Sequence, residues 1–185
     1  MYIEVDQVDL ARINRAFGRA GKAPQRLKNA INRTATQAKK MLVAGRSAGY
    51  TVKAARFNQD IKLYRASAAR LDATIKSKGR PPTIKSFKTS APKSGGKADI
   101  VKTGLKQIAA RGGGKAFIGP GGKVSGLMVK RESKSRYPLK ILHGPSVPKM
   151  VEKIYKGERG GQGNMEPKIR ERLHKEITAE LEKLI

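Results

Sequence analysis

Apolar residues recur at helical spacing near the start of the chain. A first helix is predicted after Asp9, which can act as its N-cap, with three apolar residues on one face: Leu10, Ile13 and Phe17. A longer helix is predicted from Pro24, and we expect Gly45 and the region of Gly49 to end it after about five turns. Its apolar stripe consists of Leu27, Ala30, Ile31, Ala35, Ala38, Met41 and Leu42.

The apolar period then changes from helical to alternating. A short helix is predicted over 52–58, with Thr51 as its cap. Apolar and polar residues alternate over 61–65 and again over 71–75. This alternation predicts two strands of an antiparallel pair.

Short apolar segments separated by prolines and glycines predict further strands, at 83–87, 100–101, 116–118, 127–129 and 138–142. Residues 88–99 are polar, small and basic, which predicts a flexible loop, and 157–163 predict a second loop. Pro167 then opens a C-terminal helix with apolar residues on one side: Ile169, Leu173, Ile177, Leu181 and Leu184.

These elements predict an α+β fold, in which N-terminal helices and a C-terminal helix pack on a small antiparallel sheet with long basic glycine-rich loops. We expect a single domain over 1–185, mainly helical over 1–60, mainly short strands and loops over 61–151, and helical again over 164–185. The chain lacks cysteine, a signal-peptide pattern and an apolar run near the ~20 residues that span a bilayer. It therefore reads as a soluble protein made inside the cell, without membrane contact.

The charge of the chain is strongly positive and concentrated in its middle. Lys and Arg number 41 against 14 acids, a formal charge of +27. Residues 1–9 carry −3 and residues 152–185 carry +1, so +29 lies within 10–151. Such a field attracts polyanions and acidic protein surfaces. Apolar residues make up 38%, below the usual roughly 45–50%, so the long middle region cannot all be packed into one core.

The polar face of the long helix carries five bases without acidic neighbours along the helix: Arg26, Lys28, Arg33, Lys39 and Lys40. Solvated helices usually alternate the sign of their charges at this spacing. A solvated surface remains one interpretation, and contact with DNA or an acidic partner is the other. The residues predicted for that contact are Arg26, Arg33, Lys39, Lys40 and Arg46. Base-specific readout is not supported, because zinc-finger spacing and aromatic stacking signatures are missing.

Catalytic and metal-binding patterns are not found. The Gly-Lys pairs of the glycine-rich segments precede Ala or Val, where a phosphate-binding loop needs Ser or Thr. His143 and His174 lie far apart in the sequence without a cluster of acids or thiols. Asp60 and Asp72 could meet across a hairpin, but salt bridges to nearby bases are the stronger expectation. The sequence predicts no enzyme, no cofactor and no metal site. One reading is a stand-alone basic nucleic-acid-binding protein, ribosomal or nucleoid-like.

Two pairs of segments add a family resemblance. The first pair is Asn32-Arg33-Thr34-Ala35 and Tyr50-Thr51-Val52-Lys53. The second is Ser135-Arg136-Tyr137-Pro138-Leu139 and Leu142-His143-Gly144-Pro145-Ser146-Val147-Pro148. Their order resembles the minor tail protein Z family of long-tailed bacteriophages and prophages, over roughly 8–185, apart from glycine-rich inserts around 93–123.

The resemblance implies a structural virion protein that completes the head-proximal end of the tail and makes it competent to join a DNA-filled head. The implied partners are the tail terminator, the tail tube end, the tape measure protein, other neck proteins and the DNA end. The six-fold symmetry of tails implies a homo-oligomeric ring. Residues predicted for the assembly interface are Arg136, Tyr137, Pro138, Pro145 and Pro148, with internal packing and chain turning as the alternatives.

Overall fold

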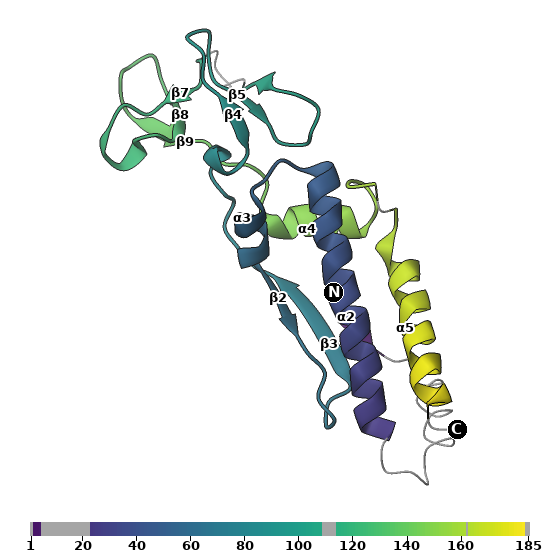
Figure 1. Cartoon of the computed structure of the whole chain (residues 1–185). Helices are drawn as coiled ribbons and strands as arrows, with labels where there is room; N and C mark the ends of the chain where they lie inside the picture. The colour runs from purple at the N-terminus through teal and green to yellow at the C-terminus, as the bar shows by residue number, and fades with distance from the viewer. Residues whose placement is uncertain (1, 5–22, 109–113, 162, 184–185) are drawn as a thin grey trace.

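The fold is α+β, as the sequence predicts, and it is elongated. The computed structural model describes residues 2–4, 23–108, 114–161 and 163–183. We call the part formed by residues 2–4, 23–77, 147–161 and 163–183 the helical body. Residues 88–108 and 114–141 form the β-tip, which extends from one end of the body (Figure 1). The helix predicted after Asp9 lies outside the described residues.

Helix α2 (Ala23–Gly49) is the centre of the helical body. It lies between the sheet on one side and α5 (Met165–Glu182) on the other (Figure 1). Its predicted apolar stripe is buried except for Met41, which is half-buried against the same core. The prediction that Gly45 helps to end the helix is wrong, because α2 continues to Gly49 over 27 residues. Gly45 is buried instead, since the backbone of Gly160 packs directly against it.

The sheet of the body has the strand order β1-β3-β2. Strands β2 (Ile61–Tyr64) and β3 (Asp72–Ser77) form the predicted antiparallel pair, with Leu63 opposite Ile75. Strand β1 (Tyr2–Glu4), which the sequence pattern did not indicate, pairs with the other edge of β3. Helix α2 packs on this sheet, and this contact joins the long apolar stripe to the buried side of β3.

The short helix α3 (Ala54–Gln59) confirms the element predicted over 52–58, but not its cap. Lys53 precedes the helix, and no side chain caps its first turn. The hydroxyl of Thr51 donates instead to the carbonyl oxygen of Asp99 and accepts a hydrogen bond from the backbone N–H of Lys88. Thr51 therefore holds two strands of the β-tip against the end of α2.

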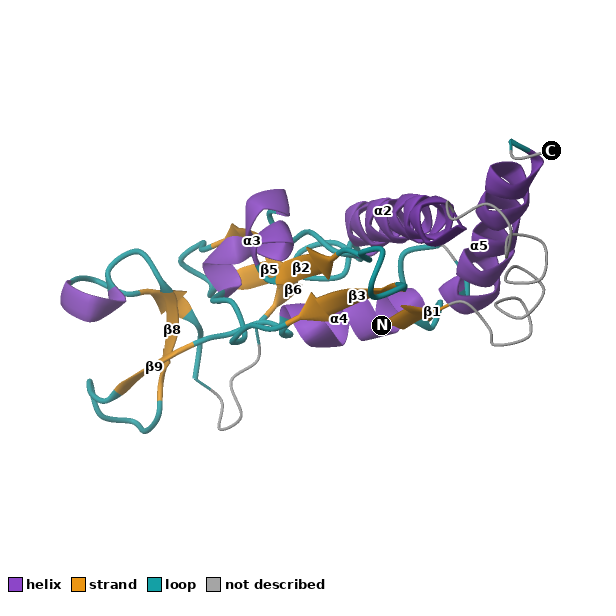
Figure 2. Ribbon diagram, turned by 90° about the horizontal axis from the view of Figure 1, so that it is seen from below, coloured by secondary structure: helices purple, strands orange, loops and turns teal. Residues whose placement is uncertain are grey.

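Two helices complete the body. Helix α5 (Met165–Glu182) is the predicted C-terminal helix, and its Ile169, Leu173 and Ile177 are buried. Helix α4 (Val147–Tyr155) was not predicted; it crosses α2 near the C-terminal end of α2 (Figures 1 and 2). Three apolar side chains of α4 at positions i, i+3 and i+7 are fully buried, namely Val147, Met150 and Ile154. Pro148 at its start is compatible with a helix, because backbone N–H groups in the first turn have no acceptor within the helix and proline lacks only that group.

The first sheet of the β-tip consists of β4 (Lys88–Ser90), β5 (Lys97–Asp99) and β6 (Lys106–Gln107). Two predictions are wrong here. The segment 88–99 is a paired hairpin rather than a flexible loop, because Thr51 fixes both of its strands. The strand predicted at 100–101 is absent, since β5 ends before it.

A one-turn 3₁₀ helix (Ile84–Ser86) replaces the strand predicted over 83–87. Ile84, the first residue of this helix, and Phe87, which follows it, are both buried. A spacing of three positions fits one 3₁₀ turn and not a strand. Phe87 lies so close to Gly144 that a Cβ at Gly144 would lie 2.4 Å from its ring. This contact and Thr51 connect the β-tip to the body.

The second sheet of the β-tip contains the three strands predicted near its glycine turns. They are β7 (Phe117–Ile118), β8 (Met128–Arg131) and β9 (Leu139–Ile141), in the order β7-β8-β9. Met128 and Ala116 pack with Ile84 and Ala98 in a small second core, separate from the core of the body.

Candidate functional site

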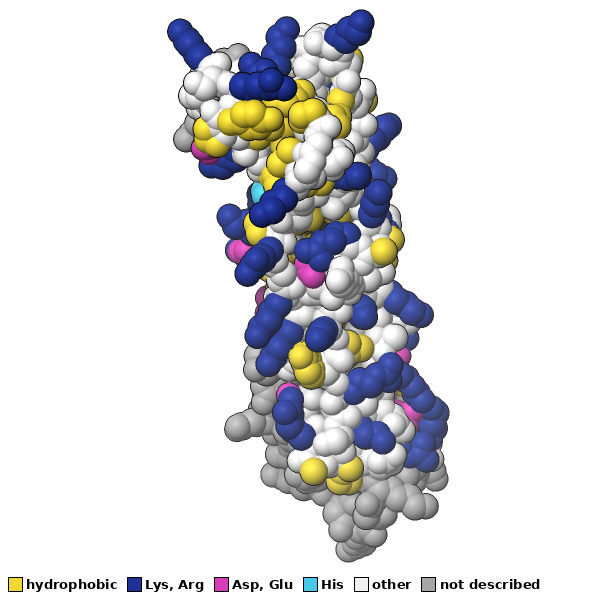
Figure 3. Space-filling view, turned by 90° about the vertical axis from the view of Figure 1, so that its left-hand side faces the viewer, with side chains coloured by type: hydrophobic (Ala, Val, Ile, Leu, Met, Phe, Trp, Pro, Cys, Tyr) yellow, Lys and Arg dark blue, Asp and Glu magenta, His cyan; other side chains and the backbone are white. Residues whose placement is uncertain are grey.

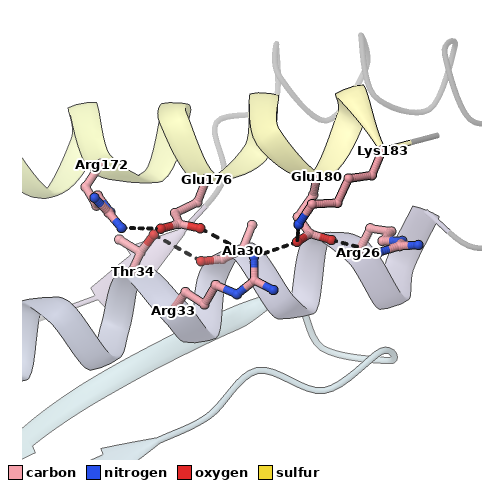
Figure 4. Close-up of polar contacts among 8 residues, drawn as sticks. All are labelled: Arg26, Ala30, Arg33, Thr34, Arg172, Glu176, Glu180 and Lys183. Atoms are coloured by element: carbon pink, nitrogen blue, oxygen red, sulfur yellow. Dashed lines mark hydrogen bonds and ion pairs between the residues drawn. The ribbon is translucent and has the colours of Figure 1, made fainter. Parts of the chain in front are cut away.

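A buried carboxylate joins α2 to α5. Glu180 of α5 has a side chain only 3% exposed, and three cations surround it (Figure 4). Its carboxylate oxygens lie 2.6 Å from Arg33 Nη1, 3.0 Å from Lys183 Nζ and 3.2 Å from Arg26 Nη1. Because α5 runs antiparallel to α2, its C-terminal turns bring this acid to the N-terminal half of α2.

Glu176, one turn before Glu180 on α5, extends the same network. Its carboxylate lies 2.6 Å from Arg172 Nη2 and 3.6 Å from Arg33 Nη1. The expectation that the basic face of α2 lacks acidic partners is therefore wrong for Arg26 and Arg33. A signal was present in the sequence, because Glu176 and Glu180 occupy helical positions adjacent to the buried apolar stripe of α5.

The surrounding cations determine the charge of Glu180. Burial by itself raises the pKa of this carboxyl, but hydrogen bonds from Lys183, Arg26 and Arg33 outweigh it and hold the pKa below its ordinary value. The carboxylate is thus charged near neutral pH and stabilises the α2–α5 contact.

We expect Glu180→Gln to lower the free energy of unfolding by about 1–3 kcal/mol near pH 7, because three cations lose their shared acceptor. The loss of stability is modest because Arg33 and Lys183 are each about half exposed, so water already screens their charges. A lowered folded-state pKa gives stability that is present above the ordinary glutamate pKa and is lost as pH falls through the folded-state value. The difference between the two proteins should therefore shrink below about pH 4 in urea unfolding curves. A difference that grows in acid would contradict this assignment.

A polar groove of about 550 Å³ runs along α2 beside this network. We call it the α2 groove, and it is lined by Lys28, Asn29, Asn32, Arg33, Thr36, Gln37, Arg65, Arg172 and Glu176. The side-chain amide of Asn32 donates to the carbonyl oxygen of Ala66 and its oxygen accepts the N–H of Ala66, which fastens the β2–β3 loop at its wall. Four cations line this groove, and two of them, Arg33 and Arg172, pair with Glu176 or Glu180. Lys28 and Arg65 make no ion pair with a described acid, so they are the cations available to an anion such as a phosphate. Sequence reasoning missed Arg65 and Arg172, which come from other elements.

The remaining predicted contact residues on α2 divide into two kinds. Arg46 donates to the carbonyl oxygen of Val52 and to the hydroxyl of Ser47, so its guanidinium supports the end of the helix. Lys39 is half-buried and Lys40 is exposed, and neither makes an ion pair with a described acid. Lys40 lies 14 residues after Arg26 and 7 after Arg33, so it lies on the same basic face of the helix, further along it than the residues that Glu180 contacts.

The predicted interface residues lie at two separate places. Arg136, Tyr137 and Pro138 are exposed in the loop between β8 and β9, where the Arg136 guanidinium lies 5.8 Å from the Tyr137 ring centroid. Tyr137 is 61% exposed, which leaves its ring available to a partner. Pro145 and Pro148 are half-buried at the start of α4, where Pro148 belongs to the first helical turn. The structure does not bring the five residues into one cluster.

The described residues contain no group of three or more His, Asp or Glu side chains placed to hold a metal ion. Both histidines are exposed. Asp60 pairs with Arg56 and Asp72 pairs with Arg70, as the salt-bridge interpretation predicts.

The comparison with known families identifies the chain. The model described as Prophage minor tail protein Z (GPZ) matches residues 10–185, nearly the whole chain. The chain belongs to this prophage minor tail protein Z family. It is a family of structural phage tail proteins, which places the chain among proteins of the virion tail and implies contacts with other tail proteins. No curated protein and no solved structure was found to match the chain. Among the described residues, no helix is both long and apolar enough to cross a bilayer.

The segments that carry the family resemblance have structural roles in this minor tail protein Z family member. Asn32 clamps the β2–β3 loop, Arg33 pairs with Glu180, and the buried Thr34 hydroxyl donates to the carbonyl oxygen of Ala30. Thr51 and Gly144 lie where the β-tip joins the body. These residues fix the body and its junction with the β-tip.

Proposed function

We propose that this chain completes the head-proximal end of the phage tail and enables the tail to join a DNA-filled head, without catalysing a reaction. The observation that carries this proposal is the family match over 10–185. The partners that we propose are the tail terminator, the tail tube end, the tape measure protein and other neck proteins. We further propose that several copies form a ring with the six-fold symmetry of the tail.

The charge of the molecule supports contact with the DNA end or with acidic tail proteins. Lys and Arg outnumber Asp and Glu by 27, so the acids of the chain cannot neutralise its positive charge. Lys and Arg side chains lie along the described part of the face in Figure 3, while acids are few there. The α2 groove and Lys40 provide cations on the body for such a contact.

The same charge also favours a second candidate function, a stand-alone nucleic-acid-binding protein. The two differ in their dependence on salt. Binding carried by phosphate contacts weakens by about 0.9 in log K per neutralised phosphate for each tenfold rise in salt, whereas assembly through apolar contacts persists. A complex with purified tails that survives about 0.5 M salt, where exposed charges are largely screened, supports tail completion.

The direct test uses a prophage that lacks this gene. We expect its heads and tails to accumulate separately, and we expect added purified protein to restore infectious particles. Joined particles at the normal level without the protein would overturn the proposal.

A charge variant tests the α2 contact in the same joining assay. We expect Lys39→Gln with Lys40→Gln to reduce joining several-fold while leaving the unfolding curve unchanged, because neither lysine pairs with a described acid. Arg33 is left intact, since Glu180 needs it. The matched control removes two exposed lysines from the β2–β3 hairpin region, Lys62→Gln with Lys78→Gln. Equal joining by both variants would contradict a role for this face of α2.

A further inference from the structure

One face of the second β-tip sheet is apolar. Phe117 lies opposite Val129, and Val129 lies opposite Ile141, so the three residues form a row across β7, β8 and β9. Directly opposed residues in antiparallel strands lie on the same face of a sheet. Val129 is fully buried between its neighbours, while Phe117 and Ile141 are half-buried. Leu139, two residues before Ile141, extends this face. We call these four residues the apolar row.

The opposite face of this sheet packs in part on the second core, and Ile118, which pairs with Met128 on that face, is 45% exposed. The apolar row is not part of either core. Met128 and Ala116 project to the second core with Ile84 and Ala98. Neither hydrophobic cluster of the described residues includes a member of the apolar row. Figure 3 shows hydrophobic side chains gathered on the surface at this end of the molecule, the end that β7, β8 and β9 form in Figure 1.

The surroundings of the apolar row are strongly basic. Segment 114–145 carries seven Lys and Arg and a single acid, Glu132, which lies 3.8 Å from Lys140 Nζ. The guanidinium of Arg131 lies 5.8 Å from the ring centroid of Phe117 and so borders the row directly. An apolar centre with a cationic border complements an apolar surface with an acidic border.

This charge pattern separates the possible occupants. A second copy of the same face would place two strongly basic borders against each other, which is repulsive. Nucleic acid would use the border but leave the apolar row exposed to water. A membrane anchor needs apolar side chains that project into the lipid. The accessible members of the row, Phe117, Leu139 and Ile141, are each half-buried, which leaves area on which a protein surface can pack.

We propose that the apolar row binds another protein of the tail through a surface that has an apolar centre and an acidic border. This inference rests on the proposed function, which supplies the tail as the setting. It assigns the β-tip to the protein contact and leaves the basic face of α2 for the DNA end or a second acidic surface.

Site-specific photocrosslinking in purified tails tests this contact. p-Benzoylphenylalanine replaces Phe117 in the full chain, and the matched control replaces Tyr64, an aromatic residue of the body that is 46% exposed. We expect position 117 to crosslink to one tail protein, at a peptide next to acidic residues, with at least tenfold higher yield than position 64. Crosslinks from 117 to a second copy of this chain, to DNA or to lipid, or no crosslink in tails that contain the protein, would overturn the inference.

Reversal of a border charge tests the complementarity. Arg131 lies opposite Leu139 on the face of the apolar row. We expect Arg131→Glu to lower the crosslinking yield from position 117 at least fivefold, whereas Lys62→Glu on the body leaves it unchanged; an unchanged yield with Arg131→Glu would overturn the acidic border. Incorporation into tails is a separate measurement, given by the number of copies of the chain that sediment with the tails. A chain that is absent from tails contradicts the proposed function, whereas a chain that is present but does not crosslink from 117 contradicts only this contact.

Discussion

Replacing Ile31 with aspartate is expected to unfold the chain. Ile31 is fully buried in the middle of the α2 stripe, next to Leu27 and Ala35, which are also buried. An aspartate there would place a carboxylate among apolar side chains. The buried Glu180 shows what such a group requires, because three cations surround its oxygens. Position 31 has apolar neighbours in the core, so we expect a loss above about 4 kcal/mol, which is most of the stability of a domain near the low end of the usual 5–15 kcal/mol.

Circular dichroism and urea unfolding measure this loss, and two controls separate its causes. Ile31→Val removes one methyl group and should cost only about 0.5–1.5 kcal/mol. Lys40→Asp introduces the same carboxylate on the exposed side of the same helix and should change stability by about 0.5 kcal/mol or less. A midpoint for Ile31→Asp equal to that of Lys40→Asp would show that the stripe is not the core of the body.

The long elements could be predicted because their information is local. The stripe of α2 and the apolar side of α5 repeat at 3.6 residues over many turns, and the alternation around Leu63 and Ile75 indicates a strand pair. The end of α2 at Gly49 was among the predicted positions, but its continuation past Gly45 could not be predicted in this way. Glycine usually signals a helix end, but Gly45 serves a contact with Gly160, which is distant in the sequence.

The short elements depend on partners that a local pattern does not reveal. The polar segment 88–99 forms strands because Thr51 holds both of them, and Thr51 itself had the local appearance of a helix cap. Helix α4 has a helical apolar spacing, but Pro145 and Pro148 were predicted as interface or chain-turning residues and no helix was predicted there. In both cases a tertiary contact outweighed the local preference.

The candidate surfaces also combine features that are evident locally in the sequence with features that depend on tertiary contacts. The basic residues of α2 were evident from the sequence, whereas the pairing of Arg26 and Arg33 with Glu180 required the docking of α5. The apolar row of the β-tip exists only because the register aligns Phe117 with Val129, and one residue of slippage would turn one of them to the other face. Which strands pair, and in which register, is not contained in the strand pattern alone.

The contact between the α4–α5 loop and the end of α2 gives a second large expected effect, from Gly160→Ala. Gly160 is buried with φ +90°, a backbone conformation that costs an alanine about 1–2 kcal/mol. Its added Cβ would lie 2.6 Å from the carbonyl oxygen of Gly45 and 2.8 Å from its Cα. Because these atoms belong to a helix backbone, relief requires the loop to move away from α2. We expect a total loss of about 3 kcal/mol in urea unfolding.

Gly161→Ala is the matched control, since it adds the same methyl group one residue later. Gly161 also has a positive φ, +66°, but a Cβ there would meet nothing within 4 Å. The free energy of unfolding of Gly161→Ala should therefore fall only by the cost of the positive φ, about 1–2 kcal/mol. The difference between the two variants then measures the cost of the close approach to Gly45. Equal losses of unfolding free energy would mean that the loop moves away from α2 without an energetic cost. A greater loss at Gly160 would show that the buried glycine inside α2 is needed because another backbone packs against it.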